Sequence, residues 1–370
     1  MTLLKQKIIE KIKSEGPINF ETFMEMALYY PGLGYYTKET TKIGRAGDFY
    51  TSPHLHRIFG AMLGKQMEEM WNLMGKPDSF NIIEIGAGMG YLAKDMLDYL
   101  KNREFYQHLK YSIVELNPFM KAEQQKMLAE YIDKLNWVSS LNELDSVTGC
   151  FISNELLDAF PVRMVEMDDS LMEIYVSVKD DEFIELKMPC SSEIIEYLKD
   201  YSAEISKRYR TEVNLKLKDW LADVNTKLSK GFILTIDYGY NAKDYYNEER
   251  NRGTLLCYYH HEINENPYQH VGEQDLTAHV NFSSLKRWGE ELGLKTIGFC
   301  PQGSYLISLR IDGVITELYG DSPDSFEIAK IKGLIFPQGM GESHKVMVQY
   351  KGEGMPVLNG FGIRNQSERL

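Results

Sequence analysis

The 370-residue chain contains only four cysteines, and they lie far apart in the sequence. Cys150, Cys190, Cys257 and Cys300 form none of the spacings that are typical of a zinc site, a redox motif or a disulfide framework. We therefore expect no metal site, and we expect these isolated cysteines to be small buried hydrophobic residues. The pattern suits a reducing compartment.

Long hydrophobic runs are also missing, since no apolar stretch approaches the ~18 residues of a transmembrane helix. The first 14 residues contain no arginine, whereas a transit peptide is typically rich in arginine and serine. Their apolar residues recur at helical spacing, which predicts a docking helix that ends at Gly16-Pro17. We therefore expect a soluble cytoplasmic protein with no membrane span.

Basic residues are outnumbered by acidic ones, because 41 Lys and Arg face 54 Asp and Glu and give a formal net charge of −13. A surface this negative repels nucleic-acid phosphates and anionic lipids, so we expect no nucleic acid as a partner. A basic segment of another protein is favoured instead. The oligomeric state does not follow from the sequence.

The remaining composition, with 43% hydrophobic and 26% charged residues, is that of a globular protein. From residue 80 onward, short β-branched runs alternate with helical patterns, which predicts a mainly parallel sheet with helices on both faces. No repeat or linker divides the chain. The strands expected in this sheet are 80–85, 111–115, 137–138, 150–153, 232–236, 254–258, 306–309 and 345–350.

Two regions depart from this alternation. Residues 18–53 are rich in Gly, Tyr and Pro, which predicts an ordered loop, and a helix is expected after it at 56–74. Between 161 and 230 short strands are followed by helices at 193–208 and 215–228, which predicts an inserted β-hairpin and a helical lid.

A glycine-rich turn follows the strand at 80–85 in the run Glu84-Ile85-Gly86-Ala87-Gly88-Met89-Gly90. Glycines at a strand-to-helix turn let a ligand touch the backbone, and the helix N-terminus offers unpaired N–H groups. A dinucleotide site would have its third glycine at position 91, which is Tyr91 here. The spacing favours a nucleoside that carries an amino acid over NAD, and a simple tight turn is the alternative.

Glu115 ends the next strand, where a carboxylate can accept hydrogen bonds from both ribose hydroxyls. A solvated strand end is the alternative interpretation. Together with the glycine turn, Glu115 predicts that S-adenosylmethionine is the cofactor.

A second polar cluster lies at the carboxyl end of another strand, where open α/β folds place their active sites. Asn154, Glu155 and Asp158 bring an amide and two carboxylates into one short segment. A guanidinium is protonated at pH 7, so a carboxylate pair that orients it and takes its proton suits methyl transfer to arginine. Helix capping by Asn154 or Asp158 is the alternative.

The chain resembles the MidA family of class I methyltransferases, which includes the mitochondrial complex I assembly methyltransferase. The matching motifs extend from about residue 16 to residue 350 and include Gly16–Phe20, Ala27–Pro31, Gly34–Tyr36, Gly47–Pro53, Glu84–Gly90, Val114-Glu115, Asn154–Val162, Asp237–Gly239, Gly253–Leu255, Asp275–Val280 and Met340–Glu342. One departure is visible, because the chain reads Pro337-Gln-Gly-Met-Gly-Glu342 where the family suggests Pro-Gly-Glu-Met-Gly-Glu.

The resemblance implies a Rossmann-like methyltransferase core with an N-terminal helical and aromatic cap and an inserted region. The implied boundaries are 1–75 for the cap, 76–160 and 231–350 for the core, 161–230 for the insertion and 351–370 for the tail. It also implies methylation of arginine in a protein substrate such as a respiratory complex I subunit. A cofactor-binding assembly chaperone and a small-molecule methyltransferase are the alternatives.

The resemblance also assigns roles to individual residues. Asn154, Glu155 and Asp158 are expected to be catalytic, and Asp237 and Tyr238 are expected to face the same cleft. His279 is expected to contact the substrate or to support the site, either as a general base or as a structural residue. The residues expected to hold the cofactor are Gly47, Asp48, Phe49, Thr51, Ser52, Pro53, Glu84, Gly86, Ala87, Gly88, Glu115 and Leu116.

Overall fold

The computed structural model describes residues 2–39, 52–201, 206–320 and 324–370, and the chain divides into two compact units. Unit 1 comprises Met1–Phe49, Leu157–Asp219 and Tyr240–Asn281, and unit 2 comprises Tyr50–Leu156, Trp220–Gly239 and Phe282–Leu370. Each unit therefore combines segments that are distant in sequence. The domain boundaries expected at residues 75, 160, 230 and 350 stay a prediction.

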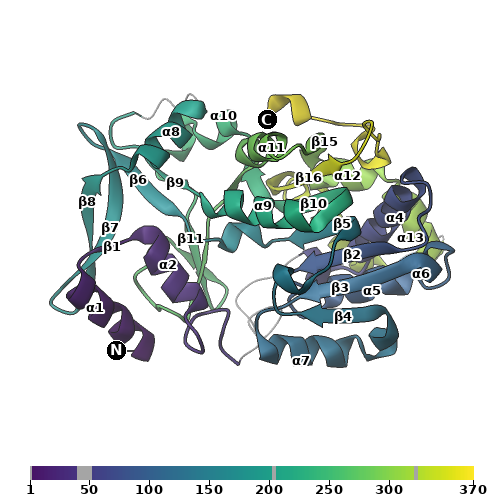
Figure 1. The fold of residues 1–370 in the computed structure, drawn as a ribbon, viewed down its shortest axis with the longest axis horizontal. Coiled ribbons are helices and arrows are strands. Elements are labelled where there is room, and N and C mark those ends of the chain that lie inside the picture. Colours follow the sequence, from purple (N-terminus) through teal and green to yellow (C-terminus); the bar gives the residue numbers. More distant parts are fainter. Residues whose placement is uncertain (1, 40–51, 202–205, 321–323) are drawn as a thin grey trace. The chain divides into compact units, whose positions relative to one another are not determined.

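Unit 2 contains a central sheet whose strand order is β15-β16-β10-β5-β2-β3-β4 (Figure 1). The neighbours from β10 to β4 are parallel, whereas β16 pairs antiparallel with both β10 and β15. The predicted mainly parallel sheet in an α/β protein is thus confirmed. The strands are β2 (Phe80–Ile85), β3 (Leu109–Val114), β4 (Leu135–Val138), β5 (Val147–Asn154), β10 (Leu228–Tyr240), β15 (Lys295–Pro301) and β16 (His344–Lys351).

Helices of unit 2 cover this sheet and share one hydrophobic core with it. Two of them, α4 and α5, approach closely at Gly60, which has no side chain. A Cβ at this position would lie 2.5 Å from the Cβ of Asp95. The helices are α3 (Ser52–Leu55), α4 (Ile58–Leu73), α5 (Tyr91–Leu100), α6 (Phe105–His108), α7 (Pro118–Met127), α9 (Lys216–Lys227, which begins in unit 1), α11 (Phe282–Glu291), α12 (Gln302–Ser308), α13 (Ile311–Tyr319), α14 (Ser325–Ile335) and α15 (Met340–Ser343), with short 3-10 helices at Ala129–Lys134, Leu141–Glu143, Asn359–Phe361 and Ser367–Arg369.

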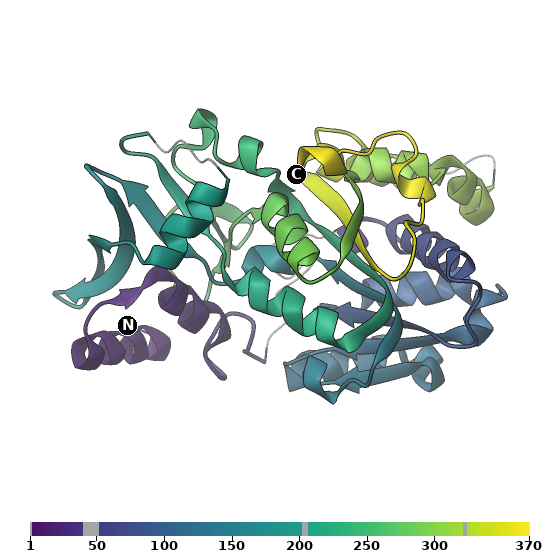
Figure 2. The same ribbon diagram turned by 45° about the horizontal axis from the view of Figure 1, so that its top comes forward.

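Unit 1 contains two antiparallel sheets, one with the order β1-β7-β6-β9, to which β8 adds beside β7, and one with the order β12-β11-β13. Helices α1 and α2 pack against the first sheet and contribute to its core (Figures 1 and 2). The elements are α1 (Leu3–Glu15), β1 (Ile18–Asn19), α2 (Phe20–Tyr29), η3 (Leu157–Ala159), β6 (Arg163–Met167), β7 (Leu171–Lys179), β8 (Glu182–Pro189), α8 (Ser192–Asp200), β9 (Arg210–Val213), α10 (Ala242–Tyr245), η4 (Glu248–Arg250), β11 (Leu256–Tyr259), β12 (Glu262–Asn264), β13 (Asp275–Thr277) and β14 (Val280–Asn281).

The predicted N-terminal helix is confirmed. The Thr2 side chain caps α1 by accepting a hydrogen bond from Lys5 N, and Gly16 ends the helix at φ 90°. Leu4, Ile8, Ile9 and Ile12 are buried, as their spacing predicts. The hairpin predicted within the insertion is also present as β7 and β8.

Several expected elements are wrong. Residues 306–309 lie in and directly after α12 rather than in a strand, because a short apolar run is compatible with either structure. The strand near 254–258 is β11, and it belongs to a separate small sheet. Residues 20–29 form α2 within a segment expected to be a loop, since Asn19 caps this helix and its apolar face is buried. The helix expected at 193–208 ends at Asp200.

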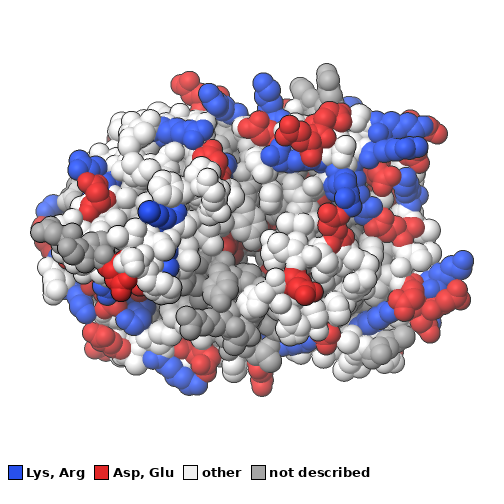
Figure 3. All heavy atoms as spheres, turned by 180° about the vertical axis from the view of Figure 1, so that it is seen from behind, with Lys and Arg blue, Asp and Glu red and all other residues white. Residues whose placement is uncertain are grey.

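The remaining expectations concern the cysteines and the surface. All four cysteines are free, and Cys150, Cys257 and Cys300 are buried as expected. Figure 3 shows one face of the molecule, on which Lys and Arg side chains are interspersed with Asp and Glu side chains. In the described part of the chain, no helix is both long enough and apolar enough to cross a membrane.

Candidate active site

The polar residues singled out from the sequence meet at one edge of the sheet in unit 2. Strands β2, β3, β5 and β10 are parallel, so their carboxyl ends share that edge. Glycines follow β2, Glu115 follows β3, and Glu155 follows β5, while Asp237 lies near the end of β10. This is the edge at which open α/β sheets bind ligands.

The glycine turn after β2 needs backbone conformations that other residues rarely adopt. Gly86, Gly88 and Gly90 have φ values of 74°, 54° and 84°. A Cβ at Gly86 would lie 2.8 Å from Leu156 Cδ1, so a side chain there would crowd the end of β5. Gly90 is the N-cap of α5 and has no side chain to satisfy the first N–H groups, so these remain available for a ligand.

Glu84 lies beneath this turn with its carboxyl group in a hydrogen bond from Tyr111. The distance from Tyr111 Oη to Glu84 Oε2 is 2.6 Å, and both side chains are buried. Burial raises the pKa of Glu84 to about 7, and the hydrogen bond from Tyr111 opposes this rise. Glu84 thus gains or loses its proton near neutral pH.

Glu115 is tied to the glycine turn through Gln124, a buried residue of α7. Gln124 Nε2 donates to Glu115 Oε2 and to the carbonyl oxygen of Gly88, both at 2.8 Å. Its Oε1 accepts from Trp137 Nε1 at 3.0 Å, which sets the orientation of the amide. The other carboxylate oxygen of Glu115 accepts from Asn117 N at 2.8 Å. Gln124 belongs to no sequence motif, so its contacts with Glu115 and Gly88 could not be predicted from the sequence.

This half of the edge fits a nucleoside that carries an amino acid. Each oxygen of Glu115 has one protein donor and keeps a lone pair for a ribose hydroxyl. The glycine turn offers backbone N–H groups close by. Burial raises the pKa of Glu115, and the hydrogen bonds from Asn117 and Gln124 partly offset this rise because they stabilise the charged carboxylate.

Glu155 lies directly after β5 in an uncommon backbone conformation with φ 48°. Its own N–H donates to the carbonyl oxygen of Ile236 at 2.9 Å. Its side chain is 5% exposed, and Oε1 accepts from Ser52 N at 3.0 Å and from Asn154 Nδ2 at 3.2 Å. A strained residue that several contacts hold in place is typical of a functional site.

Asp237 stabilises the turn that contains Glu155. This fully buried carboxylate accepts from Leu156 N at 3.2 Å and from Tyr238 N at 2.9 Å. It therefore connects the ends of β5 and β10. The sequence placed Asp237 and Tyr238 at the cleft, and the structure brings both to the same edge as Glu155.

His344, at the start of β16, is a residue of this site that the sequence did not indicate. Its Nε2 lies 3.8 Å from Glu155 Oε1, and its side chain is 7% exposed. Ser343 Oγ lies 3.1 Å from Nδ1, and the ring of Tyr238 packs edge-on against the imidazole. The antiparallel pairing of β16 with β10 brings His344 to this position.

Two expected site residues belong to unit 1. Asp158 is buried, and its carbonyl oxygen accepts from Ala278 N at 2.9 Å. The N–H of His279 donates to Thr254 Oγ1 at 3.0 Å, and its ring packs against Tyr240. The boundary between the two units falls after Leu156, so Asn154 and Glu155 belong to unit 2, and the catalytic role expected for Asp158 stays a prediction.

The expected cofactor residues near the N-terminus are described only in part. Gly47, Asp48, Phe49 and Thr51 lie outside the described residues, as does the side chain of Pro53. Ser52 is buried, and its Oγ donates to Gln302 Oε1 at 3.2 Å. Among the other expected contacts, Ala87 is 8% exposed and Leu116 is 74% exposed.

Comparison with known proteins identifies the family of the chain. Residues 62–300 match the model of a family described as S-adenosyl-L-methionine-dependent methyltransferases. A Burkholderia thailandensis protein whose crystal structure contains S-adenosyl-homocysteine is 29% identical, with a TM-score of 0.91 over 99% of this chain and 96% of that chain. This likeness confirms the expected class I methyltransferase fold and the cofactor class.

Curated relatives are also similar over most of their length. The protein arginine methyltransferase NDUFAF7 homolog of Drosophila melanogaster is 26% identical over 94% of this chain and 85% of its own. Protein arginine methyltransferase NDUFAF7 of Rattus norvegicus is 25% identical over 100% of this chain and 89% of its own. Both are named mitochondrial, so the cytoplasmic location expected above is wrong. That expectation rested on the composition of a short amphipathic helix, which does not determine a compartment.

Proposed function

Since the chain belongs to the family of S-adenosyl-L-methionine-dependent methyltransferases, we propose that its acceptor is the arginine side chain of a protein. The curated relatives, which are named protein arginine methyltransferases, support this acceptor. A respiratory complex I subunit is the narrower substrate that the family resemblance implies.

The observation that carries the proposal is the setting of Glu155. This carboxylate is held by Ser52 N and Asn154 Nδ2 at the sheet edge that also bears the glycine turn and Glu115. Both of these donors reach Oε1, so Oε2 is the oxygen that is left to face an acceptor. A fixed carboxylate of this kind can bind a guanidinium through charge-assisted hydrogen bonds.

The cofactor residues are proposed from the same edge. Gly86 and Gly88 would approach the cofactor through their backbone, and Glu115 would bind its ribose hydroxyls. When bound, S-adenosylmethionine supplies a methyl group on a positively charged sulfur. Glu84 and Gln124 would hold the glycine turn and Glu115 in position relative to each other.

Glu155 has two tasks in this proposal. It orients the guanidinium so that one nitrogen lone pair faces the methyl group, and it receives the proton which that nitrogen loses. Asn154 and Ser52 fix the carboxylate while it does so, and Asp237 holds the backbone of the same turn. The roles expected for Asp158 and His279 stay predictions.

Transfer of a tritiated methyl group tests this function. The purified chain is incubated with tritiated S-adenosylmethionine and proteins of the host lysate, and labelled bands are hydrolysed for amino-acid analysis. We expect label on methylarginine. Label on lysine, on a carboxyl group or on a small metabolite would contradict the arginine assignment.

A further inference from the structure

Unit 1 contains a cavity of about 530 Å³ that is lined by none of the residues proposed to bind the cofactor or to hold Glu155. All of its lining residues belong to unit 1, and they come from the strands β6, β8 and β9, from the segments 250–256 and 265–268, and from Arg208 and His279. Eight of them are charged, in a 4:4 ratio of arginine to glutamate. A volume of this size accommodates a few side chains of a bound peptide.

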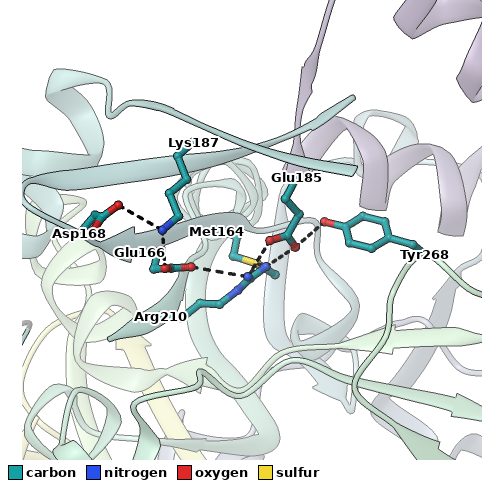
Figure 4. Close-up of polar contacts among 7 residues, drawn as sticks. All are labelled: Met164, Glu166, Asp168, Glu185, Lys187, Arg210 and Tyr268. Atoms are coloured by element: carbon teal, nitrogen blue, oxygen red, sulfur yellow. Dashed lines mark hydrogen bonds and ion pairs between the residues drawn. The ribbon is translucent and has the colours of Figure 1, made fainter. Parts of the chain in front are cut away.

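One wall of the cavity is a connected ionic network around Arg210 (Figure 4). The Arg210 guanidinium forms two hydrogen bonds with Glu185, at 2.8 Å from Nη1 to Oε2 and at 2.5 Å from Nη2 to Oε1. Tyr268 Oη donates to the same carboxylate at 2.8 Å. Glu166 lies 3.7 Å from Arg210 and accepts from Lys187 Nζ at 2.7 Å. Arg210, Glu185 and Glu166 therefore all have ion-pair partners within this network.

Glu212 is buried in another part of the lining, and the chain around it is adapted to its carboxylate. It accepts from Thr254 N, Thr254 Oγ1 and Leu255 N at 2.9–3.2 Å. Gly253 has φ 82°, and a Cβ there would overlap the Glu212 carboxylate. Gly253-Thr254-Leu255 is one of the motifs that carry the family resemblance, and none of its residues is among those proposed to bind the cofactor or to catalyse methyl transfer.

Not every charged residue of the cavity has an ion-pair partner among the described residues. Each of the four lining carboxylates has an internal partner, since Glu265 pairs with Arg252 in addition to the contacts above. Within the described part of the chain, Arg208 and Arg250 have no carboxylate within ion-pair distance. Arg250 donates through Nη1 to the carbonyl oxygen of Asp244, and its guanidinium stacks on Tyr240 at 3.8 Å. Arg208 and Arg250 are therefore the lining cations that remain for an anionic ligand.

We propose that this cavity binds an acidic segment of the protein substrate, with Arg208 and Arg250 receiving its carboxylates. A guanidinium presents several N–H donors in one plane and pairs with a carboxylate through two hydrogen bonds. The inference rests on the proposed function for the identity of the ligand as a protein. It adds that the substrate carries aspartate or glutamate in the segment that binds to unit 1.

Binding of a short probe tests the cavity without methyl transfer. A fluorescein-labelled peptide of four glutamates, capped at both ends, is titrated with the full chain, and fluorescence anisotropy reports the dissociation constant. Arg208→Gln with Arg250→Gln should weaken binding by about ten-fold or more. Lys7→Gln with Lys11→Gln is the matched control, because it removes the same charge from α1 of the same unit and should change binding less than about two-fold.

Three results would overturn the proposal. The first is equal loss of binding in the arginine and lysine variants, which would indicate a general effect of charge. The second is stronger binding of a four-lysine peptide, and the third is binding of inorganic phosphate but not of the glutamate peptide at Arg208 and Arg250. A thermal melt checks that both variants are folded.

The methylation assay separates this inference from the proposed function. The arginine variant should raise KM for the protein substrate while leaving kcat within about two-fold. An unchanged KM would contradict substrate docking in the cavity even if arginine is methylated. If arginine is not methylated but the arginine variant still weakens peptide binding, the proposed acceptor is contradicted. The cavity would then remain a binding site for an anionic peptide.

Discussion

The backbone N–H of Ser52 donates a hydrogen bond of 3.0 Å to Glu155 Oε1, although 103 positions separate the two residues. This bond connects the start of α3 with the turn after β5. Together with Asn154 it commits one carboxylate oxygen to the protein and leaves the other for an acceptor. The carboxylate is therefore preorganised, which is the property that a proton acceptor at a methyl-transfer site requires.

Glu155→Gln should lower kcat of methyl transfer by roughly 10²–10⁴, the usual range for the loss of a positioned proton acceptor. The affinity for S-adenosylmethionine should stay within a few-fold, because the glycine turn and Glu115 are untouched. Steady-state kinetics and isothermal titration measure the two effects. Glu182→Gln, at an exposed glutamate of β8, is the control, and full activity of Glu155→Gln would refute its role.

His344→Phe should lower kcat by about three- to ten-fold and leave KM unchanged. Phenylalanine keeps the ring packed on Tyr238 but removes the nitrogen that lies 3.8 Å from Glu155 Oε1. His344→Ala is the companion variant, and it should lose both the ring contact and the nitrogen. If His344→Phe were as active as the unchanged chain and only His344→Ala were impaired, the histidine would act by packing alone.

Gly86→Val should weaken binding of S-adenosylmethionine by about two orders of magnitude or more. Valine is strained at φ 74°, and its Cβ would crowd Leu156 Cδ1. Gly75→Val is the matched control, because Gly75 has φ 84° and no atom within 4 Å of a Cβ. Both variants should lose stability, but only Gly86→Val should lose the cofactor, as isothermal titration would show. Equal cofactor affinity in the two variants would contradict the assignment of the glycine turn.

The raised pKa of Glu84 predicts that the stability of the chain depends on pH. Its folded-state pKa of about 7 lies above the ordinary value of 4.5, so its contribution is fully present below about pH 4.5 and is lost as pH rises through about 7. The free energy of unfolding is therefore lower by roughly 3 kcal/mol at high pH than at low pH because of this group. Glu84→Gln should therefore stabilise the chain at pH 8 relative to the unchanged protein, with little gain at pH 4.5. Urea unfolding at the two pH values measures this, and an equal gain at both would show that the buried charge is not responsible.

The sequence predicted the parallel sheet and the positions of its polar strand ends because both depend on local patterns. Alternating strands and helices imply parallel neighbours, and parallel strands bring Glu115 and Glu155 to one edge. It did not predict Gln124 and His344, whose roles depend on tertiary packing. Gln124 lies in α7 and donates a hydrogen bond to Glu115, which precedes that helix. His344 lies near Glu155 because β16 pairs with β10 and β15 in the sheet.

The run at 306–309 shows the limit of short-range pattern. The sequence predicts a strand there, whereas these residues lie in and directly after α12. A four-residue apolar run does not distinguish a strand from a helix, so tertiary packing decides between them.

The measurement that tests the central claim most directly is mass spectrometry of proteins incubated with S-adenosylmethionine that carries a deuterated methyl group. Parallel reactions contain the unchanged chain and Glu155→Gln, and peptides are searched for the added heavy methyl. We predict heavy methyl groups on arginine nitrogen in the reaction with the unchanged chain and at least about 100-fold less in the reaction with Glu155→Gln. Heavy methyl groups on any other residue type, or equal arginine labelling in both reactions, would contradict the account.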